Sequence, residues 1–367
     1  MCLESCDMVK QSIAILIGTR PELIKMAPVI RRLRERKIPF IFIHSGQHYS
    51  QEMDQQIMED LKMPKPDYNL EVGSGTHASQ TGRIMERVEN ICLERKPPVM
   101  LVHGDTNTTL AGALTAKKIH IPVGHIEAGL RSYDYRMPEE INRILTDRIS
   151  DILFAPTEGA RQNLLKEGID DKLIKVTGNT VVDAVKEHLT FCQKSLILSK
   201  LGFKEEGYIV VTAHRPENVD DPDNLKQLIE LLDYVSNKLG KKIIWPIHPR
   251  TEKQVKEFKY EIPENILTIP PIGYIDMLKL LNCSALVLTD SGGVQEEAYV
   301  LRKPLITLRD STERPETLTA NFIVHLSREK VDKALKAYEN NNIHWDNVFG
   351  NGTASDKIVD ALVPYVN

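Results

Sequence analysis

The chain has 367 residues, and its 47 lysine and arginine residues against 51 aspartate and glutamate residues give a formal net charge of −4. Because no basic surplus is present, the composition argues against a nucleic-acid partner. No apolar run approaches the roughly 20 residues of a membrane-spanning helix, and residues 1–10 contain no apolar stretch typical of a secretory signal. We expect an ordinary globular protein of about two domains, without membrane contact.

Five cysteines stand at scattered positions, and only Cys2 and Cys6 are close together. An odd number without a second ligand pair predicts neither a disulfide framework nor a zinc site. We therefore expect free thiols in the reducing cytoplasm.

Strand-like and helix-like segments alternate along the first half of the chain. The strands expected there are residues 12–18, 40–45, 99–104, 122–126, 151–155 and 173–178. Helices are expected over residues 21–35, 77–95 and 107–119, and Glu139 is expected to open another after Pro138. Strands that are apolar on both faces are typical of a parallel sheet covered by helices.

A second series of the same kind follows in the other half. Its expected strands are residues 208–213, 242–247, 266–269, 285–289 and 304–307, with helices over 222–239 and 294–301. The more polar segment 190–207 predicts a linker, and a last helix is expected over 354–364. These features indicate two doubly wound α/β domains.

Polar residues gather directly after the predicted strands. They lie in segments 18–22, 44–48, 103–107, 125–129, 213–218, 247–250 and 290–297. In such sheets ligands bind beyond the carboxyl ends of the strands, so we expect this edge to be functional, with the two domains facing a cleft.

Segment 290–297 has the best pattern for an anion site. Gly292 and Gly293 follow a strand and open a helix, so backbone N–H groups and the helix dipole would face a phosphate, while Glu296 or Glu297 would accept ribose hydroxyls. An ordinary glycine turn with a cap remains the alternative. The chain contains neither a Gly-x-Gly-x-x-Gly fingerprint nor a Walker loop, so we expect no dinucleotide cofactor.

Charged residues supply candidates for the rest of a site. Arg20, Lys25 and Arg314 are either ligands of a diphosphate or solvated surface charges. Asp105, Glu127 and Glu139 are candidate proton donors and acceptors, although Glu139 also suits a helix N-terminus. Six histidines at the same edge lack metal-ligand spacing, so we favour hydrogen bonds to phosphate or sugar over a metal: His44, His48, His103, His125, His214 and His248.

Taken together and in order, these motifs resemble those of the non-hydrolysing UDP-N-acetylglucosamine 2-epimerases between about residues 13 and 320. The matching segments are Gly18-Thr19-Arg20-Pro21-Glu22 with Lys25, Gly104-Asp105-Thr106, residues 127–131, residues 138–143, Thr177-Gly178-Asn179, residues 214–218, residues 290–297 and residues 312–316. Each motif alone is weak, but the ordered combination is highly specific.

The resemblance implies a glycosyltransferase-B-like fold, a homodimer, and no NAD or pyridoxal phosphate. It implies Rossmann-like domains at 1–182 with 354–367, and at 183–353, the second binding UDP. It also implies reversible epimerisation of UDP-GlcNAc to UDP-ManNAc, in which UDP is eliminated to leave 2-acetamidoglucal and is then added back. Such an enzyme supplies ManNAc-type sugars for surface polysaccharide or glycan synthesis.

The resemblance also implies roles for single residues. Those expected in catalysis are Asp105, Glu127, Glu139 and His214. Those expected to bind substrate are Arg20, Lys25, Arg143, His214, Arg215, His248, Tyr274, Ser291, Gly292, Gly293, Glu297 and Arg314. Gln47 and His48 match a second site at which relatives bind UDP-GlcNAc as an activator.

Two departures from the family pattern leave the sugar open. Residues 132–137 form a shorter stretch than in familiar bacterial members, and His248-Pro249-Arg250 replaces a pattern that contains asparagine. Both changes occur in relatives that act on UDP-2,3-diacetamido-glucuronic acid, so that substrate is the first alternative. A hydrolysing epimerase, a glycosyltransferase of the same fold and a non-catalytic nucleotide-sugar-binding protein are the others.

Overall fold

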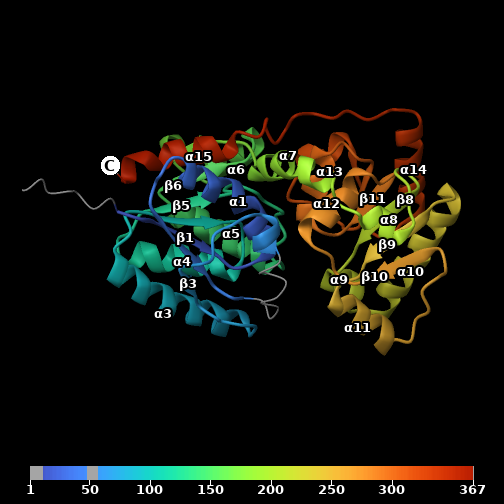
Figure 1. Ribbon diagram of the computed structural model, residues 1–367, viewed down its shortest axis with the longest axis horizontal. Helices are drawn as coiled ribbons and strands as arrows, with labels where there is room; N and C mark the ends of the chain where they lie inside the picture. The colour runs from blue at the N-terminus through green and yellow to red at the C-terminus, as the bar shows by residue number, and fades with distance from the viewer. Residues whose placement is uncertain (1–10, 48–56, 367) are drawn as a thin grey trace, which may run out of the picture. The chain divides into compact units, whose positions relative to one another are not determined.

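The computed structural model describes residues 11–47 and 57–366. The chain divides into two compact units, Met1–Ala184 with Phe349–Asn367 and Val185–Val348. Figure 1 traces both units along the chain. Within the described ranges, the structure has no helix both long and apolar enough to cross a membrane.

The first unit is built on a seven-stranded parallel sheet in the order β3-β2-β1-β4-β5-β6-β7. Its strands are β1 (Ile13–Ile17), β2 (Phe40–His44), β3 (Tyr68–Asn69), β4 (Met100–His103), β5 (Val123–Ile126), β6 (Ile152–Ala155) and β7 (Ile174–Val176). All five residues of β1 are buried, as expected of a central strand covered on both faces. The strand order reverses between β1 and β4, which is where such sheets bind ligands.

Helices cover this sheet, and the last helix of the chain belongs to the same unit. They are α1 (Arg20–Glu35), α3 (His77–Arg95), α4 (Asn107–Lys118), α5 (Pro138–Ile149), α6 (Glu158–Lys166), α7 (Thr180–Cys192), which continues into the second unit, and α15 (Ala354–Leu362). Helix α15 packs beside α1 (Figure 1), where Arg36 donates to Asp356 at 2.9 Å. The two ends of the described chain therefore stabilise one unit.

The second unit has a six-stranded parallel sheet in the order β10-β9-β8-β11-β12-β13. Its strands are β8 (Tyr208–Thr212), β9 (Lys242–Pro246), β10 (Ile266–Ile269), β11 (Leu286–Thr289), β12 (Leu305–Thr307) and β13 (Asn321–Ile323). Its helices are α8 (Ile197–Leu201), α9 (Pro216–Val219), α10 (Pro222–Leu239), α11 (Pro249–Glu257), α12 (Tyr274–Asn282), α13 (Gly292–Val300) and α14 (Arg328–Glu339). Here the order reverses between β8 and β11.

The two sheets confirm the prediction of two doubly wound α/β domains. The sequence did not indicate β3 and β13, which have only two and three residues. The expected linker over residues 190–207 is wrong in detail, because α7 continues to Cys192 and α8 follows. The division between the units falls inside α7.

Candidate active site

Glu22 occupies the turn between β1 and α1. Its Oε2 accepts from the backbone N–H groups of Gly18 at 2.6 Å and Thr19 at 2.7 Å. Its Oε1 accepts from the hydroxyls of Thr106 at 2.7 Å and Thr109 at 3.2 Å, next to Asp105. Burial raises the pKa of this carboxyl to about 7. The Glu22 carboxyl therefore occupies the position at the N-terminus of α1 where an anion would bind, and it links the turns after β1 and β4.

Lys25 and Glu127 form a buried ion pair in the same unit. Asn179 also donates to Glu127 Oε1 at 3.3 Å. The backbone of Glu127 has φ +69°, a left-handed conformation that non-glycine residues rarely adopt and that is often retained at functional sites. The turn after β5 thus holds the Glu127 carboxylate against a cation. The role of Lys25 as a diphosphate ligand stays a prediction.

Asp105 and Arg143 are also brought together. Asp105 Oδ2 accepts from Arg143 Nη2 at 2.6 Å and from Nε at 3.0 Å, while Arg143 Nη1 donates to Glu140 Oε2 at 2.5 Å. Arg143 is buried, whereas the Asp105 side chain is 31% exposed and accessible to a ligand. Glu139 lies in the first turn of α5, three residues before Asn142, which donates to the Asp105 carbonyl at 2.9 Å.

His103 and His125, two of the three buried histidines described at this edge, differ from each other. Burial lowers the pKa of His103 to about 4, so the ring is neutral. Its Nε2 lies 3.9 Å from Glu127 Oε2, and neither ring nitrogen has a hydrogen-bond partner among the described residues. His125 is completely buried, and both of its nitrogens contact protein acceptors. The expectation that His125 binds phosphate or sugar is therefore wrong.

In the second unit, the N-terminus of α13 has the features of an anion site. No acidic residue lies in its first turn, and the Ser291 side chain makes no capping hydrogen bond. Arg314 lies directly over Gly292, because a Cβ at that position would come within 2.7 Å of Nη1. Arg314 Nε donates to Glu296 at 2.5 Å. Glu296 is thus a partner of Arg314, which leaves Glu297 as the candidate ribose ligand.

Asp290 organises the neighbouring turn after β8. Its Oδ2 accepts from the backbone N–H groups of His214 at 2.8 Å and Arg215 at 2.9 Å, and from Asn218 Nδ2 at 3.1 Å. His214 Nδ1 lies 3.2 Å from Asp290 Oδ1. Burial opposes ionisation, but the contacts with His214 outweigh it and lower the pKa of Asp290. The carboxylate therefore orients the imidazole of His214, leaving its Nε2 on the opposite side of the ring.

The remaining predicted ligands of this unit lie around the same sheet edge. His248 caps α11 by accepting from the Arg250 N–H at 3.2 Å, and its ring centroid is 5.4 Å from that of His214. Tyr274 is buried, its ring meets His188 edge-on, and burial raises the pKa of its hydroxyl well above the usual value. Tyr274 is 4% exposed, and its hydroxyl has no hydrogen-bond partner among the described residues; its uracil contact stays a prediction.

The predicted second site is only partly described. The Gln47 side chain accepts from Thr108 Oγ1 at 2.7 Å, which places it against α4 near the switch point. His48 lies outside the described residues.

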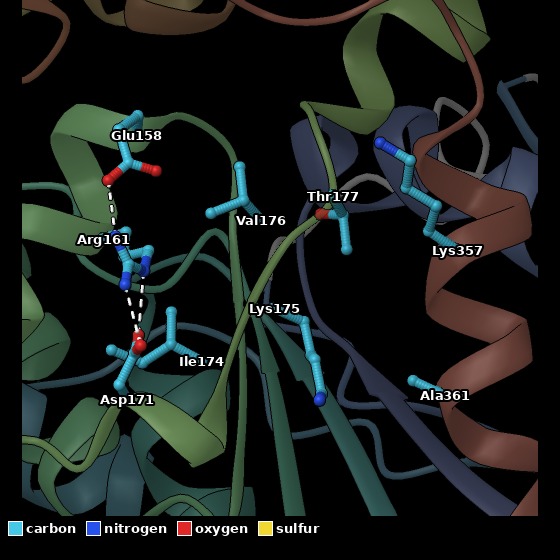
Figure 2. Close-up of a pocket in the computed structure, with 9 residues that line it drawn as sticks. All are labelled: Glu158, Arg161, Asp171, Ile174, Lys175, Val176, Thr177, Lys357 and Ala361. Atoms are coloured by element: carbon cyan, nitrogen blue, oxygen red, sulfur yellow. Dashed lines mark hydrogen bonds and ion pairs between the residues drawn. The ribbon is translucent and has the colours of Figure 1, made fainter.

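A cavity of about 400 Å³ lies elsewhere in the first unit, between α6, β7 and α15. Figure 2 shows its lining, in which Arg161 is held by Glu158 and Asp171. None of the predicted catalytic or binding residues lines it. This cavity is therefore separate from the candidate residues of both sheet edges.

Some residues that form the buried contacts of the site were not predicted from the sequence. Glu22, Glu140 and Asn179 stand inside the quoted motifs but received no role, and Asp147 was not singled out. The sequence of α5 contains a pattern that could have predicted them. Charged residues at positions 140, 143 and 147 follow helical spacing and form one buried stripe. Such a stripe indicates a polar contact with a neighbouring element.

The chain is similar in sequence to known proteins over most of its length. A family model described as UDP-N-acetylglucosamine 2-epimerase matches residues 31–363. A UDP-N-acetylglucosamine 2-epimerase of Methanocaldococcus jannaschii is 48% identical over 359 residues, covering 95% of this chain and 98% of the relative. A UDP-2,3-diacetamido-2,3-dideoxy-D-glucuronate 2-epimerase of Pseudomonas aeruginosa is 42% identical over 357 residues, covering 95% and 99%.

A solved structure shows the same fold. The crystal structure of the Methanocaldococcus jannaschii UDP-GlcNAc 2-epimerase in complex with UDP-GlcNAc and UDP matches with a TM-score of 0.91 at 48% identity. The match covers 96% of this chain and 100% of that chain. This agreement confirms the predicted glycosyltransferase-B-like fold.

Proposed function

Because the chain belongs to the UDP-N-acetylglucosamine 2-epimerase family, we propose that it interconverts UDP-GlcNAc and UDP-ManNAc without an added cofactor. The observation that carries the proposal is the set of acids on the first unit's sheet edge. Asp105 follows β4, Glu127 follows β5 in a strained backbone conformation, and Glu139 opens α5. Inversion at a carbon centre needs proton transfer on two faces, and a mere binding protein needs no such acids.

The chemistry divides between the two units. In the forward direction, a carboxylate of the first unit removes the C2 proton while the C1–O bond to the diphosphate breaks. The C–H electron pair forms the C1=C2 bond of 2-acetamidoglucal. A carboxylic acid then protonates C2 on the opposite face, and the diphosphate adds back to C1. Which of Asp105, Glu127 and Glu139 serves each face is left open.

The second unit retains the leaving group. The α13 N-terminus with Ser291, Gly292 and Gly293 faces the diphosphate, and Arg314 and His214 supply positive or hydrogen-bonding partners. Arg215, His248, Tyr274 and Glu297 contact the rest of UDP, and Arg20 and Lys25 stay predicted ligands of a diphosphate. Stabilising the departing charge is a large share of catalysis, because the C2 proton is weakly acidic.

Product analysis tests this function. Purified enzyme is incubated with UDP-GlcNAc alone, and the nucleotide sugars are separated and identified by NMR. The proposal predicts an equilibrium mixture with UDP-ManNAc and no free amino sugar. Free ManNAc would identify a hydrolysing enzyme, and turnover that appears only after an acceptor is added would identify a glycosyltransferase.

A second candidate substrate is UDP-2,3-diacetamido-glucuronic acid. The 42% identity to the Pseudomonas aeruginosa enzyme named for that compound supports it, as does the short stretch over residues 132–137. Competition between equal concentrations of the two compounds decides between them. Exclusive turnover of the diacetamido compound would replace UDP-GlcNAc in the proposal.

Exposed apolar side chains on and before α5 support the prediction of a homodimer. Ile141 and Leu145, one helical turn apart, are 45% and 47% exposed, and Tyr133 and Tyr135 precede them on the surface. We propose a homodimer that covers this face, and light scattering of an Ile141→Asp/Leu145→Asp variant tests it by the predicted shift to a monomer. We propose a cytoplasmic location because the three described cysteines are all buried and form no disulfide. We propose a role in surface polysaccharide synthesis because the product is a ManNAc-type sugar nucleotide.

A further inference from the structure

A buried ion pair lies beneath the turns that carry two of the acids. His125 belongs to β5 and Asp147 to α5, and both side chains are almost completely excluded from solvent. His125 Nδ1 lies 2.7 Å from Asp147 Oδ1. Neither residue belongs to the proposed set of substrate-contacting groups, so their burial requires another explanation.

The second ring nitrogen of His125 reaches the turn of Asp105. Its Nε2 lies 2.8 Å from the carbonyl oxygen of Gly104, the residue before Asp105. A carboxylate and a carbonyl are both acceptors, so the ring has to donate from both nitrogens. Only the imidazolium form does so. His125 thereby fixes the backbone at the end of β4.

The second carboxylate oxygen of Asp147 reaches the turn of Glu127. Oδ2 accepts from the backbone N–H of Gly129 at 3.1 Å and lies 2.7 Å from Arg131 Nη2. Burial opposes ionisation of Asp147, but His125 and Arg131 outweigh it and lower the pKa of the carboxyl. Asp147 therefore holds the loop two residues beyond Glu127.

We propose that His125 and Asp147 are positioning residues of the epimerase reaction, and that their ion pair sets the places of three acids at once. Asp105 is held through Gly104, Glu127 through Gly129, and Glu139 because it stands on the same helix as Asp147. The proposal rests on the proposed function for its kinetic readout. Small displacements of catalytic groups are costly, since about 1 Å is enough to lose roughly 100-fold in rate.

Asp147→Asn is the decisive variant. An asparagine accepts through one oxygen only, so its NH2 group faces either the His125 ring or the N–H groups of Gly129 and Arg131. We expect kcat to fall by about 100-fold. The KM for the nucleotide sugar should change by less than about threefold, because the proposed UDP ligands lie mainly in the second unit.

Asp151→Asn is the matched control. Asp151 ties the other end of the same strand, where it accepts from Val123 N at 2.9 Å and from Lys117 Nζ at 2.5 Å. It should keep kcat within about twofold, because it lies at the edge opposite the acids. Equal kcat in the two variants, or a KM change in Asp147→Asn as large as its kcat change, would overturn the proposal.

NMR of the wild-type protein tests the pair without relying on variants or turnover. With 15N-labelled histidine, long-range proton–nitrogen spectra report the protonation of each ring nitrogen, and contacts with Gly104 assign His125. Each ring nitrogen should carry a proton, as its contact with an acceptor requires. A neutral His125 ring would overturn the inference even in an active enzyme, whereas an inactive enzyme with a charged His125 would count against the proposed function alone.

Discussion

At the scale of single residues, the Glu22 carboxyl is the most unusual group on the described edge. It lies inside the protein against four donors, yet burial raises its pKa to about 7 from the ordinary value of 4.5. The folded protein therefore binds this proton more tightly than the unfolded chain does. The resulting stabilisation is complete below pH 4.5 and is lost as the pH rises through 7.

Glu22→Gln imitates the protonated carboxyl and should remove this pH dependence. Relative to the wild type, the variant should gain stability between pH 5 and pH 8, by at most about 3 kcal/mol. Chemical unfolding of both proteins at a series of pH values measures the difference. Parallel stability curves would show that Glu22 titrates normally.

Glu127 is the residue for which geometry and proposed chemistry agree best. The Glu127→Gln variant keeps the size of the side chain but has no carboxylate to exchange protons. Turnover should fall at least about 100-fold, while the Kd for UDP measured by calorimetry should stay within a few-fold. Glu158→Gln on the outer α6, where the carboxylate pairs with Arg161, is the control and should be fully active. An active Glu127→Gln enzyme would remove Glu127 from the catalytic residues.

At the scale of elements, α1 and α13 both follow the central strand region of a doubly wound sheet, but their N-termini differ. In α1 the first N–H groups bind the internal carboxylate of Glu22. In α13 the first turn has no acid, and Arg314 lies beside Gly292. The positive N-terminal end of α1 is already neutralised by the Glu22 carboxyl, whereas no acid lies in the first turn of α13. The phosphate site is therefore proposed for the second unit.

Gly292→Ala tests the α13 site. The added Cβ would stand 2.7 Å from Arg314 Nη1, so the guanidinium has to move. We expect the Kd for UDP to rise by about tenfold or more, equivalent to the loss of one charge-assisted contact. Gly82→Ala is a second helical glycine replacement with no atom within 4 Å of the new Cβ, and it should leave UDP binding unchanged. Unchanged binding in Gly292→Ala would contradict the assignment.

Elements also show what the sequence is able to predict. The long helices α3 and α10 were predicted with the bounds that the structure has, because apolar spacing directly reflects burial. The short β3 and β13 lack a readable period. Ligand motifs placed Asp105, Glu127 and Ser291 at strand ends, but side-chain pairing was not predictable. The partners of Lys25 and His125, which are Glu127 and Asp147, stand 102 and 22 residues away along the chain.

At the scale of the whole molecule, a chain with a mildly acidic net charge is proposed to bind a diphosphate. The net charge does not describe the sheet edges, because several acids are buried and accept hydrogen bonds from groups inside the protein. They include Glu22, Glu140, Asp147 and Asp290. In the proposed function, the cations and backbone amides at the two sheet edges determine the ligand chemistry. Each unit is proposed to supply a different part of that chemistry, with acids in the first and an anion-binding helix in the second.

The most direct test of this account is the fate of the C2 proton. The enzyme is incubated with UDP-GlcNAc in deuterated water without any cofactor, and the C2 position is followed by proton NMR. Elimination and re-addition predict UDP-ManNAc that carries deuterium at C2, and gradual labelling of the remaining UDP-GlcNAc. UDP-ManNAc that keeps its original C2 proton would contradict the proposed proton transfers by the acids of the first unit.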